Sequence, residues 1–239
     1  MGSDSSNKPE GGVKWQSLWW LGWSLLIVLG LALGNWQWQR AEEKRDYLAR
    51  LADAPTLETP AQAPPDGSEI HLQGHYVPQA TRFLDNRVLN GRVGVAVLTP
   101  LVDDQGRWWL IERGFVPIGP HREDPVIDTP SGRVEVSGQW QVAGERAPVF
   151  GPNQQGRWLQ SIVLDSWQHA DRFAHPGWLH QKTGAGAFAS WWKPSVMPPS
   201  RHIGYAVQWW GLALTAAAVM FFGRRYAFMS RHVVKEKSC

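Results

Sequence analysis

Two uncharged apolar stretches decide the fold class of this chain. The first reads LWWLGWSLLIVLGLALG at Leu18–Gly34, and the second reads IGYAVQWWGLALTAAAVMFFG at Ile203–Gly223. A helix needs about 20 apolar residues to cross the roughly 30 Å hydrocarbon core of a bilayer, and both stretches reach this length with their aromatic flanks. The alternative is a buried core helix, but such helices seldom lack charge over this length. We therefore expect transmembrane helices over residues 15–38 and 201–223, in an α+β membrane protein.

Tryptophan and polar residues gather at the ends of both stretches. The tryptophans there are Trp15, Trp19, Trp20, Trp23, Trp36 and Trp38 around the first, and Trp209 and Trp210 in the second. Tryptophan favours the membrane interface, because its ring is apolar while its N–H reaches water. Polar side chains lie at one end only, namely Asn35, Gln37 and Gln39 after the first stretch and His202, Tyr205 and Gln208 early in the second. Two consecutive spans place these two ends on the same side of the membrane.

Basic residues set the expected orientation, since Lys and Arg near span ends favour the cytoplasm. The C-terminal tail carries Arg224, Arg225, Arg231, Lys235 and Lys237. After the first stretch, basic residues alternate with acidic ones, and that signal alone favours the opposite orientation. The tail has the larger and less diluted bias. We therefore expect cytoplasmic segments at 1–14 and 224–239, and a periplasmic domain over 39–200.

Cleavage of the first stretch as a signal peptide is an alternative to a retained helix. The residues Ala32–Gly34 read ALG, which resembles a small-x-small cleavage site. The apolar run is longer than that of a typical signal peptide, which favours retention. A mitochondrial transit peptide is not favoured, because the start contains Asp4 and Glu10 and no arginine in its first residues.

The segment between the stretches predicts a mostly antiparallel β domain. A helical pattern continues beyond the first stretch, and a proline-rich linker follows it. Alternating apolar residues then predict strands in EIHLQGHYV, TRFLDNRVLNGRVGVAVLTPL, RWWLIERGFVPI, GRVEVSGQWQV, RWLQSIVL and PGWLHQ. Asn90-Gly91 is a favoured hairpin dipeptide. The segment DSWQHADRF is interpreted as a short helix with Asp165 as its N-cap.

No catalytic motif is present in the sequence. It contains no glycine-rich phosphate loop, nucleophile elbow, HExxH or paired CxxC, and Cys239 is its single cysteine. The middle histidines are His71, His75, His121, His169, His175 and His180, and their spacing predicts no metal site. We interpret them as surface or hydrogen-bonded polar residues and expect no enzymatic activity.

His202 is the main candidate for a ligand. It lies where the second span enters the membrane, and ionisable residues at such positions are functional candidates. Neutral imidazole is a common axial ligand of heme iron, and aromatic neighbours could cover a porphyrin face. The alternative is an interfacial histidine that contacts headgroups. On the first span, the amides Asn35, Gln37 and Gln39 could join helices or bind a polar ligand group such as a propionate, or they could simply be solvated.

Three segments in order resemble the surfeit locus protein 1 family. Near the first span, Gly34, Trp36, Gln37 and Arg40 match a Gly-x-Trp-Gln-x-x-Arg pattern. The central pair GRVGVAVLTPL and WWLIERGFVP resembles the family signature, although the family usually has Asn where this chain has Glu112. The segment HIGYAVQWWGLA, which begins at His202, resembles the signature of the second helix. Together these segments cover about Trp15 to Arg225.

The resemblance implies a bacterial inner-membrane assembly factor for aa3-type heme–copper cytochrome c oxidase. It implies binding of heme a, with His202 as the iron ligand, and action on oxidase subunit I. The expected cofactor-binding residues are His202, Tyr205, Gln208, Trp209, Trp36, Gln37 and Arg40. Heme a synthase and other assembly factors are further expected partners, together with membrane lipid and without nucleic acid. A cofactor-free scaffold for nascent oxidase subunits is the alternative.

Overall fold

The computed structural model describes residues 11–119, 123–144, 151–194 and 197–223. The chain divides into two compact units, one formed by Met1–Tyr47 with Ser195–Cys239 and the other by Leu48–Pro194. The predicted basic tail after Gly223 lies outside the described residues.

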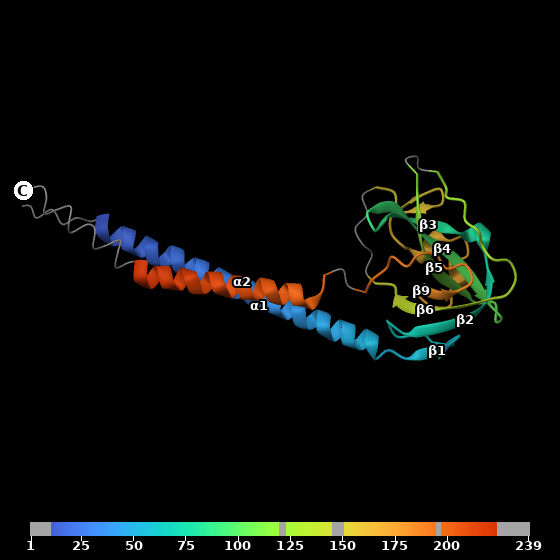
Figure 1. Ribbon diagram of the computed structural model, residues 1–239, viewed down its shortest axis with the longest axis horizontal. Helices are drawn as coiled ribbons and strands as arrows, with labels where there is room; N and C mark the ends of the chain where they lie inside the picture. The colour runs from blue at the N-terminus through green and yellow to red at the C-terminus, as the bar shows by residue number, and fades with distance from the viewer. Residues whose placement is uncertain (1–10, 120–122, 145–150, 195–196, 224–239) are drawn as a thin grey trace, which may run out of the picture. The chain divides into compact units, whose positions relative to one another are not determined.

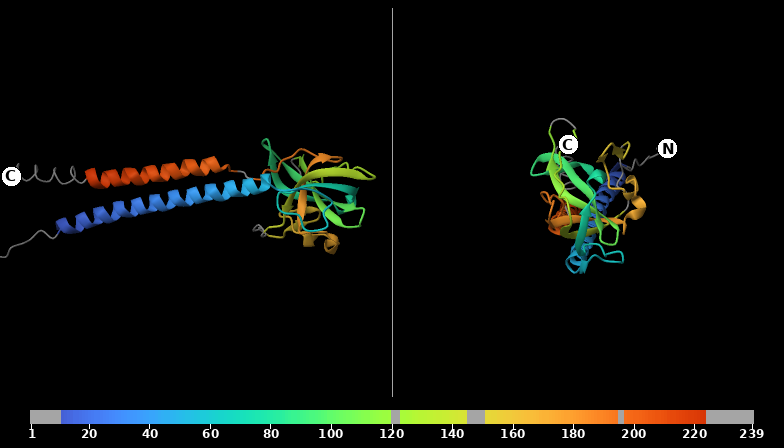
Figure 2. Two further views of the ribbon diagram at one scale, coloured as in Figure 1. Left: turned by 90° about the horizontal axis from the view of Figure 1, so that it is seen from below. Right: turned by 90° about the vertical axis from the view of Figure 1, so that its right-hand side faces the viewer.

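The first unit contains two antiparallel helices, shown side by side in Figures 1 and 2. They are α1 (Gly11–Ala52), whose residues after Tyr47 belong to the second unit, and α2 (Pro199–Ala218), which ends in a π-helical turn, η4 (Val219–Gly223). By length and composition, the segments Ser17–Ala52 and Pro199–Gly223 could each cross a membrane. The expected helix at 15–38 is therefore part of a longer one, because the charged segment after Gln39 continues as helix. Its ion pairs Arg40–Glu43 and Arg45–Glu42, three residues apart, are compatible with that helical path.

Small residues let the two helices approach closely. A Cβ added at Gly30 would lie 3.0 Å from both the Ala213 Cβ and the Trp209 carbonyl oxygen. One added at Gly34 would lie 2.3 Å from the Trp210 indole nitrogen, so the indole fills the space that a side chain would need. Small residues at such crossings are typical of membrane helices, where packing rather than water drives association.

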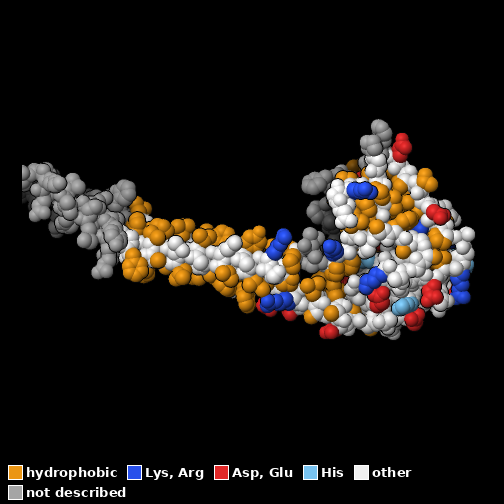
Figure 3. All heavy atoms as spheres, in the orientation of Figure 1, with side chains coloured by type: hydrophobic (Ala, Val, Ile, Leu, Met, Phe, Trp, Pro, Cys, Tyr) orange, Lys and Arg blue, Asp and Glu red, His pale blue; other side chains and the backbone are white. Residues whose placement is uncertain are grey.

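The outer faces of the helices are apolar and exposed. Leu21 is 68% exposed and Leu214 is 73% exposed, and Figure 3 shows hydrophobic side chains along the helices. An apolar surface of this length suits lipid rather than water. The helix pair thus has the surface of a membrane anchor.

The second unit is a mixed β-sheet domain, shown in Figures 1 and 2. Its strands are β1 (Thr56–Glu58), β2 (Glu69–Tyr76), β3 (Arg82–Leu89), β4 (Arg92–Asp103), β5 (Trp108–Pro117), β6 (Val134–Val142), β7 (Gln154–Gln155), β8 (Trp158–Leu159) and β9 (Gly177–Gly184). Strands β2, β6, β9, β5 and β4 pair in that order, and β4 returns to β2. The ring therefore closes as a small barrel, and closure removes the exposed edges of these strands.

The barrel interior is filled by inward-facing side chains from the five ring strands. These residues are Ile70, Leu72, Tyr76, Leu101, Trp109, Ile111, Val134, Val136, Trp140 and Leu179. Trp109 and Trp140 meet edge to face, with ring centroids 5.7 Å apart. Two further clusters, around Leu84 and Phe83, lie among β3, β4 and β8 and the loops that cover them.

The expected fold class is confirmed, with three differences in detail. Antiparallel pairs dominate, but β1–β2, β3–β8 and β5–β9 are parallel. The predicted strand RWLQSIVL is reduced to β8, because the chain turns away after Leu159. The predicted helix around Asp165 is instead two 3-10 turns, η2 (Leu164–Ser166) and η3 (Ala170–Arg172). The N-cap of η2 is Val163, so the prediction for Asp165 was wrong.

Candidate functional site

His202 contacts the first helix through Gln37. Its Nδ1 lies 2.7 Å from Gln37 Oε1, so Nδ1 carries a hydrogen and donates it to the amide oxygen. In the neutral ring, Nε2 then holds the free lone pair. Nε2 is buried and has no hydrogen-bond partner among the described residues. The helix pair therefore holds one imidazole nitrogen that is oriented and unused.

Aromatic residues pack between the same two helices, further along α2 from His202. Trp210 packs on Gly34, and its ring centroid lies 5.9 Å from that of Trp38. Trp209 is half-buried, and its carbonyl oxygen faces Gly30. The sequence did not predict that Trp38 and Trp210 would be neighbours, although both lie near the polar ends of their apolar stretches.

The other candidate residues do not join this contact. Trp36 is 51% exposed and Tyr205 is 45% exposed, and Gln208 is also exposed. Arg40 is exposed and pairs with Glu43 three residues further along α1. Of the seven candidates, the structure brings together His202 and Gln37 by a side-chain hydrogen bond.

The residues present fit an axial ligand to heme iron. An imidazole that ligates a metal usually donates its other ring N–H to an oxygen acceptor, which fixes the tautomer and the ring orientation. Gln37 supplies that acceptor, and Nε2 is the nitrogen whose lone pair is left without a partner and could ligate a metal. Because Nε2 is enclosed by protein, a porphyrin could reach it only after neighbouring side chains move. Among the described residues there is no cluster of three or more His, Cys, Asp and Glu that could hold a metal ion.

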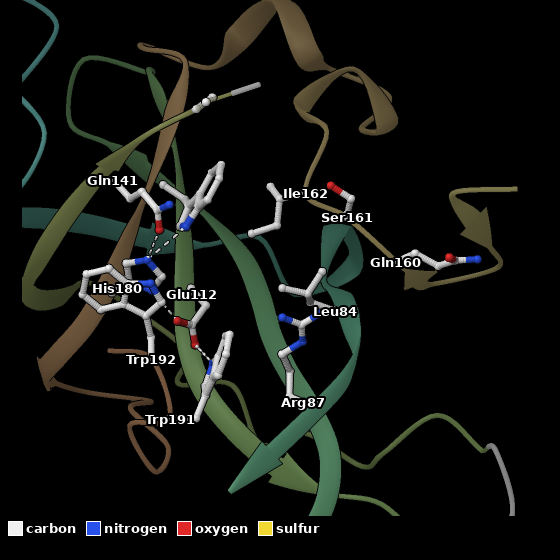
Figure 4. Close-up of a pocket in the computed structure, with 13 residues that line it drawn as sticks. Leu84, Arg87, Glu112, Gln141, Gln160, Ser161, Ile162, His180, Trp191 and Trp192 are labelled. Atoms are coloured by element: carbon white, nitrogen blue, oxygen red, sulfur yellow. Dashed lines mark hydrogen bonds and ion pairs between the residues drawn. The ribbon is translucent and has the colours of Figure 1, made fainter. Parts of the chain in front are cut away.

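A second polar cluster lies in the β unit, around a buried pair of side chains. Glu112 on β5 and His180 on β9 are paired in the parallel register, and His180 Nδ1 lies 2.5 Å from Glu112 Oε2. Trp191 Nε1 donates to Glu112 Oε1 at 3.0 Å, and the ring of Trp192 stacks on His180 with centroids 3.9 Å apart. Figure 4 shows these groups on the wall of one pocket. His180 is thus a hydrogen-bonded polar residue, as expected for the middle histidines.

The Arg-Gly pair after Glu112 has a structural role. Arg113 lies at a bulge where β5 shifts register against β4, and it is fully buried. Its guanidinium donates to Gly186 O, Thr129 Oγ1 and Asp128 O, and it lies over the ring of Tyr76. Gly114 has φ of +117°, a conformation that side chains rarely adopt. This motif holds the loop segments against the barrel.

The buried phenol of Tyr76, beside Arg113, has a raised pKa. Burial raises its pKa to about 12, against the opposing effects of the Arg113 charge and the hydrogen bond with Gln181. Tyr76 Oη lies 3.0 Å from Gln181 Oε1 and 3.1 Å from the Ala185 carbonyl oxygen. The phenol therefore stays protonated and serves as a buried hydrogen-bond donor.

The architecture is that of a small β-barrel protein with two helices suited to a membrane. The chain matches the SURF1 family over residues 24–214, and it belongs to that family. The family is non-enzymatic, which confirms the expectation that this protein is not an enzyme. A SURF1-like protein from Monosiga brevicollis is 26% identical over an alignment 249 positions long, and the alignment covers 92% of this chain and 91% of that protein. The cytochrome oxidase assembly protein SHY1 from Saccharomyces cerevisiae is 31% identical over 99 residues, which cover 37% of this chain and 25% of that protein.

Proposed function

We propose that this protein is an assembly factor for an aa3-type cytochrome c oxidase that binds heme a and assists its insertion into, or stabilisation in, subunit I. Family membership and the likeness to the yeast assembly protein support the assembly role. The observation that carries the heme proposal is the buried, unpartnered Nε2 of His202, oriented by Gln37.

In this proposal His202 Nε2 ligates the heme iron, and Gln37 keeps the ring in the required tautomer. Imidazole ligation would tune the redox potential of the bound iron. Trp209 would cover apolar surface beside the ligand. Tyr205, Gln208, Trp36 and Arg40 have exposed atoms with which to meet the porphyrin edge and its propionates.

The depth of the site supports an amphiphilic ligand. His202 lies near the start of α2, and Gln37 lies after the most apolar part of α1. An interfacial position lets a hydrophobic tail enter lipid while carboxylates meet polar groups. We propose that the chain is a bacterial inner-membrane protein with two spans, both termini in the cytoplasm and residues 39–200 in the periplasm. Heme a synthase and other assembly factors are proposed as further partners.

Absorption spectroscopy tests the ligand assignment. The full chain is purified from cells that make heme a, as wild type and as His202→Ala, Gln37→Leu and His75→Ala. We expect a Soret band in the wild type and its loss or shift in His202→Ala. Gln37→Leu removes the acceptor for Nδ1 and should weaken heme binding about 10- to 100-fold. His75 is exposed on β2, and His75→Ala should leave the spectrum unchanged.

Two results would reject parts of this proposal. An unchanged spectrum in His202→Ala would show that another group ligates the iron. A colourless wild type that still restores oxidase assembly in a deletion strain would favour the cofactor-free scaffold instead. That scaffold would act on nascent subunits through protein contacts alone.

A further inference from the structure

One pocket of the β unit, beside the Glu112–His180 pair, offers hydrogen-bond donors that lack acceptors among the described residues. It has a volume of about 330 Å³ and is lined by Leu84, Arg87, Glu112, Gln141, Ala143, Gly144, Gln160, Ser161, Ile162, Trp178, His180, Trp191 and Trp192. This size lies within the range of small-molecule sites, which are mostly apolar with a few placed polar groups.

The buried pair Glu112–His180 is satisfied by its neighbours. His180 Nε2 lies 2.6 Å from Gln141 Oε1 and 3.2 Å from Trp178 Nε1. One ring nitrogen cannot donate to the amide oxygen and also accept from the indole, and the shorter distance favours donation to Gln141. A second hydrogen lies between His180 Nδ1 and Glu112. Both members of the pair therefore have partners within the protein.

Arg87 is the remaining charged group at this pocket. Its Nε donates to the Asp85 carbonyl oxygen at 2.7 Å, and its guanidinium lies 5.1 Å from the ring centroid of Trp191. Its two terminal nitrogens donate no hydrogen bond among the described residues. Burial lowers the pKa of Arg87, and the charges of Asp85 and Glu112 oppose that shift, but an arginine remains cationic. Figure 4 shows the guanidinium beside Leu84 at the pocket wall.

The free groups are donors and the walls are apolar. Gln141 Oε1 faces His180, and the amide nitrogen of Gln141 donates no hydrogen bond among the described residues. Planar indoles of Trp178, Trp191 and Trp192 and the side chains of Leu84 and Ile162 form much of the remaining wall. Guanidinium groups recognise carboxylates through paired hydrogen bonds. We propose that this pocket binds a small organic acid with one carboxylate, held by Arg87, and a flat apolar body that packs against the tryptophans.

This inference goes beyond the proposed function and is independent of it, since every lining residue belongs to the β unit. A heme site at His202 could be absent while the acid site is present, and the reverse also holds. The His202→Ala variant should therefore bind the acid as the wild type does.

Calorimetry with a matched pair of ligands tests the site. The probes are 2-naphthoate and the neutral, nearly isosteric 2-naphthamide, titrated into the full chain in lipid nanodiscs, with empty nanodiscs as background. We expect saturable binding of 2-naphthoate, and binding of 2-naphthamide at least about tenfold weaker, because a charged hydrogen-bonded pair is lost. Equal binding of both probes would overturn the carboxylate assignment.

A matched pair of arginine variants locates the binding. Arg87→Met keeps the apolar stem and should weaken 2-naphthoate binding about 10- to 100-fold. Arg87→Lys keeps the charge but not the planar guanidinium group, and its affinity for 2-naphthoate should lie between those of the wild type and Arg87→Met. Arg92→Met, at an exposed position on the same hairpin, should bind like the wild type. Thermal unfolding of each variant verifies its fold, and a folded Arg87→Met with undiminished affinity would overturn the proposal.

Discussion

Asp103 is a buried carboxylate that closes the turn between β4 and β5. Its Oδ1 accepts from the backbone N–H groups of Gln105 and Arg107, each at 2.9 Å. Its Oδ2 accepts from Arg107 Nε at 2.9 Å and from Trp109 Nε1 at 3.0 Å. Burial raises the pKa of Asp103, but these hydrogen bonds lower it by more, so the pKa lies below its ordinary value.

The lowered pKa of Asp103 predicts acid sensitivity. A carboxylate with a depressed folded pKa contributes stability above its unfolded pKa of about 4, and this contribution is lost as the pH falls through the folded value. In Asp103→Asn, an N–H group would face the donors at Oδ2, which should cost on the order of 2 kcal/mol at pH 7. Urea unfolding at pH 7 and pH 3 should show a smaller pH-dependent loss in Asp103→Asn than in the wild type.

Asp104 provides the control for this prediction. It follows Asp103 directly but is exposed, and it pairs with Arg133 on the surface at 2.5 Å. Asp104→Asn should change stability by no more than about 0.5 kcal/mol at either pH. If both variants retain the acid sensitivity of the wild type, Asp103 is not its source.

At the scale of the elements, the bulge in β5 depends on one glycine. A Cβ at Gly114 would lie 2.8 Å from the Ala189 carbonyl oxygen, and the residue has φ of +117°. Gly91 in the β3–β4 turn also has positive φ, at +75°, but an added Cβ there meets nothing within 4 Å. Gly91→Ala should cost about 1 kcal/mol from backbone strain, and Gly114→Ala clearly more, since a backbone clash is added. Equal midpoints in thermal unfolding would contradict this difference.

The β3–β4 hairpin and the pairing of β5 with β9 show what sequence patterns can and cannot predict. Asn90-Gly91 between alternating apolar residues predicted the hairpin, because the turn and both strands are encoded locally. The pairing of Glu112 with His180 had no such signal, since it depends on the parallel register of β5 and β9, which lie far apart in the chain. The pocket depends on that register and on the position of Trp191 and Trp192. His202 was chosen as a candidate from its place at a span end, but which of the three amides would contact it depended on the packing of the helices, which brings Gln37 to it.

The close approach of α1 and α2 depends on Gly34, as the bulge in β5 depends on Gly114. Gly34→Leu would place a side chain where the Trp210 indole lies, and the helices should separate locally. The variant Gly30→Cys with Ala213→Cys reports the distance between the two helices through disulfide formation, because a Cβ added at Gly30 would lie 3.0 Å from the Ala213 Cβ. In a Cys239→Ser background, oxidation should give a high disulfide yield, and Gly34→Leu should reduce it severalfold.

Gly22 is the matched position for that experiment. It lies on the same helix, and an added Cβ meets nothing within 4 Å. Gly22→Leu should leave the disulfide yield unchanged. A yield that is equally high in Gly34→Leu would show that the glycine does not set the approach of the helices.

For the whole molecule, the two spans and the basic tail predict one membrane topology. Two apolar helices return the chain to its starting side, and the five basic residues after Gly223 favour the cytoplasm there. Green fluorescent protein fused after Cys239 should therefore fluoresce, whereas alkaline phosphatase at the same position should be inactive. In the Cys239→Ser background, Asn90→Cys at the exposed turn should react with a membrane-impermeant maleimide added to intact spheroplasts. An active phosphatase together with an unreactive Asn90→Cys would reverse the orientation, and the polar helix ends with His202 would then face the cytoplasm.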